Sequence, residues 1–216
     1  ALDGERRLVG IQARGIDGDV EPDDSVDEMA DRYVEVVRAD QPGPYVLAGY
    51  SGGGLVALEM AQRLRAVGEE VRCVILLDSV PPGCASPRRR MRVRNVVRHA
   101  AAGRIRGISP YLRDLAANGF RRRPPLVPDA DDDHVNLFDH FSAVAERHRL
   151  TRYDGRVDLL KADRVWPIQP WDYYWGPYIE DLRITSVPGD HFSMFDAPNI
   201  EHLAAEVRRI LDEVDP

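Results

Sequence analysis

A serine between glycines stands out in the stretch GYSGGG, where Ser51 lies two positions after Gly49 and two before Gly53. The stretch separates an apolar run of strand length from a helical pattern. In a Gly-x-Ser-x-Gly turn of this kind, the serine takes a strained backbone conformation and its Oγ projects from the top of the sheet. The two glycines leave room for the neighbouring strand and helix. The spacing therefore predicts that Ser51 is a catalytic nucleophile.

A phosphate-binding turn is the structural alternative for the same glycines. Gly49, Gly52, Gly53 and Gly54 do not follow the Gly-x-Gly-x-x-Gly arrangement. The lysine of a phosphate-binding loop is also missing from the stretch. The pattern therefore favours a nucleophile over a nucleotide site.

A serine hydroxyl is a weak nucleophile, so it needs a histidine base and a carboxylate that orients this base. Asp78 ends the apolar run VILLDS, and His191 follows the run ITSVPGD. Both residues come at the carboxyl ends of predicted strands, where open α/β sheets place catalytic groups. The chain order of serine, acid and histidine is that of α/β-hydrolases. Ser51, Asp78 and His191 are therefore predicted to form a catalytic triad.

Other titratable residues are weaker candidates. Asp190 is adjacent to His191, and because neighbouring loop side chains usually point apart, we expect it to shape the backbone or lie at the surface. The other histidines are in the 81–150 region or on polar helical patterns, and we expect them at the surface: His99, His134, His140, His148 and His202. No cluster of His, Cys and carboxylates has metal-ligand spacing, so no metal site is predicted.

Periodicity places these residues in an alternating series of elements. Apolar runs predict strands at 6–14, 45–50, 71–79, 155–163 and 182–190. Helical spacing predicts helices from about 26, at 53–67, around 109–118, at about 135–149 and at 197–214. Such alternation predicts an α/β fold with a mostly parallel sheet flanked by helices. The region of about 81–150 lacks a clear strand and is predicted to be an insertion between sheet strands.

Composition indicates one soluble domain covering residues 1–216. No run is apolar enough for a membrane helix and the start lacks a secretory pattern, so we expect a cytoplasmic protein. Cys73 and Cys84 are expected to be unpaired, Cys73 as a small buried strand residue. Twelve arginines and one aspartate lie between Pro87 and Arg123, which suits an acidic partner. Nucleic acid is not expected, because these arginines are not interleaved with aromatic residues.

Five segments together resemble the thioesterase domains that end nonribosomal peptide and polyketide synthases. They are IQARGIDGD, SVDEMADRYV, GPYVLAGYSGGGLVALEMAQRL, VILLDSVPPG and VPGDHFSMFDAPNIEHLAAEV. The resemblance implies an α/β-hydrolase fold with a helical lid at about 81–150. It implies that Ser51 takes the acyl chain, that His191 is general base and acid, and that Asp78 is the partner of His191. Tyr50 resembles the peptide-synthetase branch, while Gly52 departs from the family, in which a larger residue is frequent there.

The resemblance also implies a partner and a reaction. The acyl, peptidyl or polyketidyl chain arrives as a thioester on the phosphopantetheine arm of a carrier protein, with no cofactor bound to the domain itself. Water releases the product as an acid, or an internal amine or hydroxyl releases it as a macrocycle. The segment Arg88–Arg106 is a candidate carrier contact. A stand-alone editing thioesterase, a general serine esterase and a non-catalytic carrier-binding module are the alternatives.

An oxyanion hole in this fold takes one donor from the N-H after the nucleophile, here Gly52, and a second from a loop near the amino terminus. The chain begins where the family has passed that loop, so either the N-terminal strands are missing from this sequence or the domain is truncated, and we expect the former. Lid residues could be missing as well. The missing strand would lie beside residues 45–50.

An aromatic segment, RVWPIQPWDYYWGPYIEDL, precedes the His191 strand. Its aromatic residues either pack to support the histidine loop or contact substrate. As candidate substrate contacts we name Trp166 and Trp171 from this segment, together with Tyr50 and Pro81.

Overall fold

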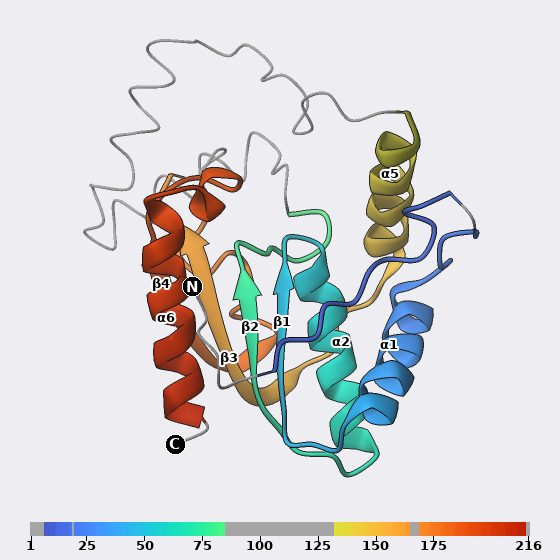
Figure 1. Ribbon diagram of the computed structural model, residues 1–216, viewed down its shortest axis with the longest axis horizontal. Coiled ribbons are helices and arrows are strands. Elements are labelled where there is room, and N and C mark those ends of the chain that lie inside the picture. Colours follow the sequence, from blue (N-terminus) through green and yellow to red (C-terminus); the bar gives the residue numbers. More distant parts are fainter. Residues whose placement is uncertain (1–6, 19, 85–131, 165–168, 215–216) are drawn as a thin grey trace.

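The structure is a computed structural model that describes residues 7–18, 20–84, 132–164 and 169–214. Four parallel strands form its sheet, in the spatial order β1 (Tyr45–Tyr50), β2 (Val71–Leu77), β3 (Tyr153–Ala162) and β4 (Ile179–Val187). Because all four strands run the same way, their carboxyl ends meet at one edge of the sheet (Figure 1). The predicted α/β class with a parallel sheet is confirmed.

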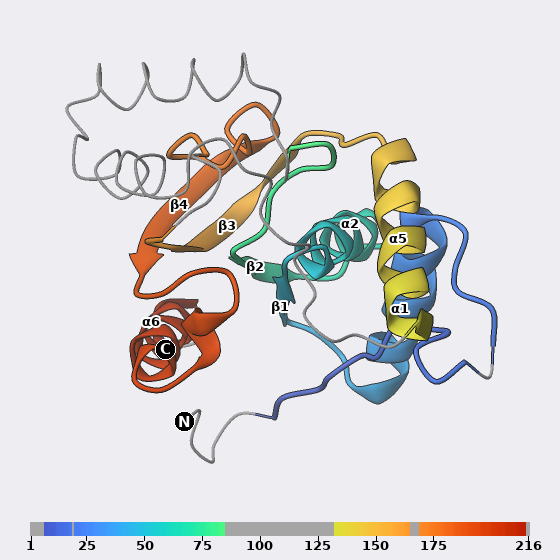
Figure 2. The same ribbon diagram turned by 90° about the horizontal axis from the view of Figure 1, so that it is seen from above.

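Two layers of helices cover the sheet. Helices α1 (Val26–Asp40) and α2 (Gly53–Ala66) lie on one face, and α6 (Asn199–Val214) lies on the other (Figure 2). Buried residues of β2 alternate between these layers, since Val74 and Leu76 pack with α2 whereas Cys73 and Ile75 pack with α6. The near-continuous apolar strand predicted from VRCVILL is therefore buried on both faces.

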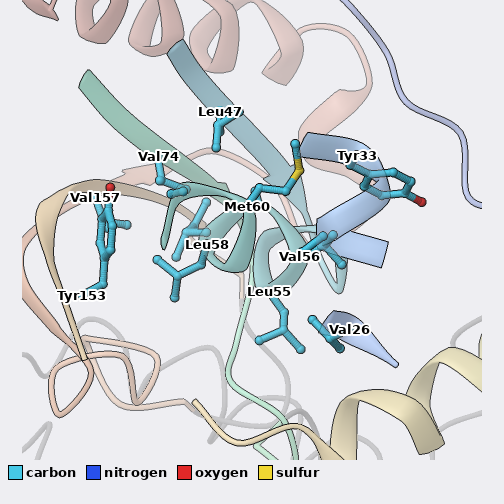
Figure 3. Packing of buried hydrophobic residues seen from close by; sticks show 14 of the residues in the cluster. Val26, Tyr33, Leu47, Leu55, Val56, Leu58, Met60, Val74, Tyr153 and Val157 are labelled. Carbon is cyan, nitrogen blue, oxygen red and sulfur yellow. The ribbon is translucent and has the colours of Figure 1, made fainter. Parts of the chain in front are cut away.

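The larger core lies between the sheet and the α1–α2 layer (Figure 3). Leu58 and Leu64 of α2 are fully buried there, and Val157 of β3 and Val26 of α1 belong to the same cluster. The first turn of α1 is capped as predicted, because the Ser25 side chain accepts a hydrogen bond from the Glu28 N-H. Gly68, with a φ of 85°, follows the end of α2.

Helix α5 (Asp132–Arg147) comes between β2 and β3 in the chain and lies beside α1 and α2 (Figures 1 and 2). It corresponds to the helix predicted at about 135–149. The predicted helix around 109–118 and the segment Arg88–Arg106 lie outside the described residues. No described helix is long and apolar enough to cross a membrane.

The strand predicted at residues 6–14 is wrong, because the described part from Arg7 onward contains no strand. Leu8 is 81% exposed, so its apolar side chain does not join the core. A strand needs a hydrogen-bonded neighbour, and an apolar run does not show whether one is available. In the described sheet, β1 is an edge strand paired with β2 alone.

Candidate active site

The turn between β1 and α2 has the geometry predicted for a nucleophile. Ser51 has a φ of 52°, in the left-handed region that non-glycine residues rarely adopt. The Ser51 N-H donates to the Leu77 carbonyl oxygen at 2.9 Å, and the Ser51 carbonyl oxygen accepts from the Gly54 N-H at 3.2 Å. These bonds hold the serine where the carboxyl ends of β1 and β2 lie side by side.

The glycines around Ser51 differ in their tasks. A Cβ at Gly49 would collide with the Gly53 backbone, which agrees with the prediction that Gly49 makes room for the turn. A Cβ at Gly53 would meet nothing within 4 Å, so the same prediction for Gly53 is wrong. Close packing instead falls on Gly54, where a Cβ would collide with the Ser79 side chain. The motif spacing alone does not reveal which later glycine packs against the next strand.

Gly52 lies at the N-terminal end of α2, with φ and ψ of −60° and −30°. The first N-H groups of a helix have no intrahelical partner, and they lie at the positive end of its dipole. This position is compatible with the oxyanion donor predicted at Gly52, which stays a prediction. A Cβ at Gly52 would collide with the ring of Phe141 from α5, so this aromatic ring occupies the space of a larger side chain at position 52.

Asp78 follows β2, and its φ is 46°. Its N-H donates to the Leu160 carbonyl oxygen at 2.8 Å, which fixes the residue against β3. A 2.7 Å hydrogen bond joins its Oδ2 to the Nδ1 of His191. The structure thus brings Asp78 and His191 together across 113 positions of sequence, as the sequence predicted.

The His191 loop is held by contacts on two sides. The Asp190 side chain accepts hydrogen bonds from the Phe192 and Ser193 N-H groups, so Asp190 shapes the loop as predicted. Burial opposes ionisation of Asp190, but hydrogen bonds from Ser193 and Phe192 outweigh it and lower the pKa of this carboxyl. On the other side, the Tyr50 hydroxyl donates to the His191 carbonyl oxygen at 2.7 Å.

Tyr50 also stacks on the imidazole of His191, with ring centroids 4.7 Å apart and planes at 27°. Burial, followed by the charges of Asp78 and Asp190, raises the pKa of Tyr50 to about 12, so its hydroxyl stays a donor. The residue immediately before Ser51 therefore touches the predicted base. The Tyr50 hydroxyl is thus engaged by the histidine loop, and the predicted substrate contact of Tyr50 stays a prediction.

A second carboxylate lies near this edge of the sheet. Asp163 follows β3, and Asp78 follows the neighbouring strand β2. The Asp163 Oδ1 accepts a hydrogen bond from the Gly189 N-H at 3.1 Å. Asp163 also follows an apolar run, and this position is the signal in the sequence that could have marked it as a candidate acid. His191 is hydrogen-bonded to Asp78, so Asp78 is the carboxylate that contacts the predicted base.

Two residues of the aromatic segment before β4 contact the Asp78 loop. Trp175 is fully buried, and its Nε1 donates to the Ser79 carbonyl oxygen at 2.9 Å. Tyr173 is also buried and donates to Asp78. The packing interpretation is therefore correct for these two residues, although the supported loop is that of the acid.

Of the other predicted substrate contacts, Trp171 is 42% exposed and Pro81 is buried. Trp166 lies outside the described residues. No contact that tests a substrate role of these residues is present, so the assignments stay predictions.

The prediction of surface histidines is wrong for His148. Its side chain is 5% exposed and lies between Asp27, at 3.5 Å, and Glu59, at 3.3 Å. His140 is part-buried, with its Nε2 2.8 Å from the Asp23 carbonyl oxygen. His202 is exposed, whereas the side chains of His99 and His134 lie outside the description. A polar helical pattern does not show that another helix covers it. Within the described ranges, no three His, Cys, Asp or Glu residues are grouped closely enough to hold a metal ion.

Both cysteines are free, and Cys73 is fully buried in β2 as predicted.

Comparison with known proteins gives one family. The family model described as "Thioesterase domain" matches residues 1–211. A curated relative named inactive atromentin synthetase invA4, from Paxillus involutus, is 40% identical over 91% of the chain and 23% of its own length. Enterobactin synthase component F of Escherichia coli is 26% identical over 98% of the chain and 16% of its own length. The chain thus spans less than a quarter of the length of each of these two relatives.

Thioesterase pytI of Aspergillus terreus is of more similar size, with 28% identity over 88% of the chain and 77% of its own length. Among solved structures, a NocB thioesterase domain in covalent complex with a fluorophosphonate nocardicin G analog has a TM-score of 0.66 and 31% identity, covering 92% of this chain and 79% of that one. RedJ, a thioesterase of the prodiginine pathway in Streptomyces coelicolor, has a TM-score of 0.62 at 21% identity, covering 93% and 78%. The RedJ likeness concerns the fold alone.

Proposed function

The chain belongs to the thioesterase domain family, and from this premise we propose that it releases an acyl, peptidyl or polyketidyl chain from the phosphopantetheine thioester of a carrier protein. The release would pass through an acyl-enzyme on Ser51. One observation carries the proposal: the 2.7 Å bond between His191 and Asp78 lies at the sheet edge that presents the Ser51 turn. Named synthetases among the relatives support a carrier-bound substrate.

The first half-reaction transfers the acyl group to the protein. His191 Nε2 removes the proton of Ser51 Oγ while Oγ attacks the thioester carbonyl carbon. The Asp78 carboxylate accepts a hydrogen bond from the Nδ1–H of His191 and stabilises the imidazolium that forms. The Gly52 N-H donates to the oxyanion of the tetrahedral intermediate. When this intermediate collapses, the C–S bond breaks and His191 donates the proton to the departing sulfur, which leaves as the pantetheine thiol.

The second half-reaction frees Ser51. Water, or an amine or hydroxyl of the acyl chain itself, loses a proton to His191 as it attacks the ester carbonyl carbon. The C–O bond to Ser51 then breaks, and His191 protonates the serine oxygen. Water as nucleophile gives an acid, and an internal nucleophile gives a macrocycle.

The carrier protein is proposed as the macromolecular partner, with Arg88–Arg106 as a candidate contact. Carrier domains that are acidic would be attracted to this basic segment, and salt would weaken such an attraction. We propose that residues 1–216 act as one domain, with no cofactor of their own.

Two other functions stay as alternatives. A general serine esterase or stand-alone editing thioesterase would use the same residues on simpler acyl groups. A non-catalytic carrier-binding module is the alternative of another class, and the name of the relative described as an inactive atromentin synthetase is the observation that favours it.

Mass spectrometry of the Ser51 peptide tests the proposal. The protein is incubated with peptidyl and polyketidyl pantetheine thioesters and quenched in acid, and an acyl adduct on Ser51 is expected. Ser51→Ala is the matched control and should carry none. Rapid turnover of simple esters without any adduct from the larger thioesters would favour the general esterase. Absence of labelling by a fluorophosphonate would favour the non-catalytic module.

A further inference from the structure

Tyr173 lies in the segment between β3 and β4 and is 1% exposed. Its hydroxyl is 2.9 Å from Asp78 Oδ1 and 3.5 Å from the Ala162 carbonyl oxygen. A hydroxyl has one hydrogen, and the shorter contact to a carboxylate is the stronger of the two. The Tyr173 hydroxyl therefore donates to Asp78, the acid that is bonded to His191.

The Asp78 carboxylate is fixed by three donors. Its Oδ1 accepts from the Ala162 N-H at 2.8 Å and from the Tyr173 hydroxyl at 2.9 Å. Its Oδ2 is left to His191, at 2.7 Å. With a single donor on Oδ1 the carboxylate could rotate about its Cβ–Cγ bond, because this torsion is broad. The second donor restricts the rotation, so that Oδ2 keeps facing the imidazole.

Tyr173 is held in place independently of Asp78. Its backbone has a φ of 48°, an unfavourable conformation for tyrosine. The Tyr173 N-H donates to the Pro170 carbonyl oxygen at 3.0 Å, and Lys161 Nζ lies 5.0 Å from the centre of the ring. A strained residue persists where its surroundings fix it, and such residues cluster at functional sites.

The hydroxyl also stays protonated. Burial raises the pKa of Tyr173 well above 10, and the charge of Asp78 raises it further. Over the pH range in which a histidine base works, the group is a neutral donor to a charged acceptor. Hydrogen bonds to charged groups are the stronger ones in proteins.

We propose that Tyr173 is a positioning residue for Asp78: its hydroxyl holds the carboxylate so that Oδ2 orients His191 for proton transfer. The inference rests on the proposed function, since it assigns His191 as the base. Tyr173 acts through Asp78 and touches neither substrate nor the reacting atoms. A tyrosine that only fills the core would need its ring but not its hydroxyl.

Tyr173→Phe tests the hydroxyl, with Tyr153→Phe as the matched control. Tyr153 is likewise buried but begins β3, whereas the Asp78 contacts are at the end of this strand. The readouts are kcat and KM for a pantetheine thioester and the low-field proton resonance of the His191–Asp78 hydrogen bond. Tyr173→Phe should lower kcat roughly tenfold with little change in KM, and should move or broaden the resonance. Tyr153→Phe should leave the resonance and kcat unchanged.

An unchanged resonance and unchanged kcat in folded Tyr173→Phe would overturn the proposal. If this variant does not fold, fluorotyrosine placed at position 173 keeps the shape of the ring and makes the hydroxyl a stronger donor. It should then move the resonance in a graded manner with the number of fluorines, and a constant resonance would overturn the proposal. The resonance does not depend on substrate, so it tests the role of Tyr173 even if Ser51 forms no acyl adduct. The absence of that adduct would overturn the proposed function and not the role of Tyr173.

Discussion

Ser51 and Asp78 are single residues that end neighbouring strands in the left-handed conformation, with φ angles of 52° and 46°. A non-glycine residue in this region costs of order 1–3 kcal/mol, so the surrounding structure must stabilise it. Their N-H groups donate to the carbonyl oxygens of Leu77 and Leu160, each on the next strand of the sheet. The sheet therefore holds both side chains at the same edge.

Asp78→Asn tests the acid. An asparagine in its place favours the wrong tautomer of His191, and kcat is expected to fall by about 10⁴-fold, the loss typical of such a change in a serine triad. Asp163→Asn is the matched control at the end of the next strand. An amide oxygen can still accept from the Gly189 N-H, so a change of about twofold or less is expected. Steady-state kinetics with one thioester compares them, and a larger loss at Asp163 would reassign the acid.

The contact between Asp78 and His191 could be predicted because each residue follows an apolar run and the order of Ser51, Asp78 and His191 matches a known chemistry. Tyr173 could not, because its contact with Asp78 spans 95 positions and nothing local marks it. Gly53 was assigned to close packing from the motif alone, yet its neighbour Gly54 meets Ser79. Motif spacing thus predicts which side chains react, whereas the contacts that hold them depend on the fold.

Helix α5 contacts the turn that carries the predicted nucleophile. The Phe141 ring lies against Gly52, in the space that a side chain at this position would fill. Gly52 departs from the family pattern, in which a larger residue is frequent, and the Phe141 ring of α5 is the physical reason that only a small residue fits here. The small size of residue 52 therefore matches the large ring of Phe141.

A double-mutant cycle tests this match. Gly52 has φ and ψ that any residue adopts, so Gly52→Leu reports on space and not on backbone strain. We expect Gly52→Leu to destabilise the fold by about 1–3 kcal/mol, because it overpacks the contact. Combined with Phe141→Ala, the leucine should cost less than it does alone, with a coupling of about 1 kcal/mol in urea unfolding.

Gly53→Ala is the neighbouring control for this cycle. Its Cβ meets no atom within 4 Å, and alanine favours a helix over glycine by about 1 kcal/mol. This variant should be as stable as the parent or more so. Additive effects of Gly52→Leu and Phe141→Ala, within about 0.5 kcal/mol, would show that the two positions do not share a space.

Most helices and strands were predictable because burial on one or both faces leaves a period in the sequence. The helix at about 135–149 and the strands at 155–163 and 182–190 match α5, β3 and β4 within a few residues. The segment 6–14 has the same apolar character, but from Arg7 onward its described residues form no strand. Strand formation depends on a partner at the sheet edge, and a periodicity in one segment says nothing about a partner.

At the scale of the molecule, charged residues connect three helices on one side of the sheet. Arg63 of α2 is bonded to Asp27 and Asp31 of α1 and to Glu59 of its own helix. His148, just beyond α5, lies between Asp27 and Glu59. Through His148, this network holds the C-terminal end of α5 against α1 and α2. Phe141 of the same helix lies against Gly52 in the Ser51 turn. The contacts between different helices could not be predicted, because charge patterns along one helix do not reveal which other helix lies against it.

The pH dependence of stability tests the core beneath the site. Burial raises the pKa of Cys73 from 9.0 to about 12, and the charge of Asp158 acts in the same direction. The folded state therefore holds the thiol proton more tightly than the unfolded state does. This contribution is complete below pH 9 and is lost as the pH rises from 9 towards 12. By pH 10, the free energy of unfolding should fall by about 1 kcal/mol.

Urea unfolding between pH 8 and 10 measures this loss. Cys73→Ala should be less stable throughout but should show a flatter dependence on pH. Val74→Ala removes a similarly buried side chain without a titrating group, so it should keep the slope of the parent. An equal slope in Cys73→Ala would mean that another group titrates.

The contact between Phe141 and Gly52 has a consequence for domain engineering. Exchanging the region between β2 and β3 with that of a relative would give a chimera of two thioesterase-family domains. Such a chimera inherits the donor's residue in place of Phe141 but keeps Gly52 from the recipient. A transplanted helix with a smaller residue there would leave a void beside the Ser51 turn, whereas a larger residue at position 52 of a recipient would collide with Phe141 of a transplanted α5. Residue 52 should therefore be replaced together with the segment that contains α5.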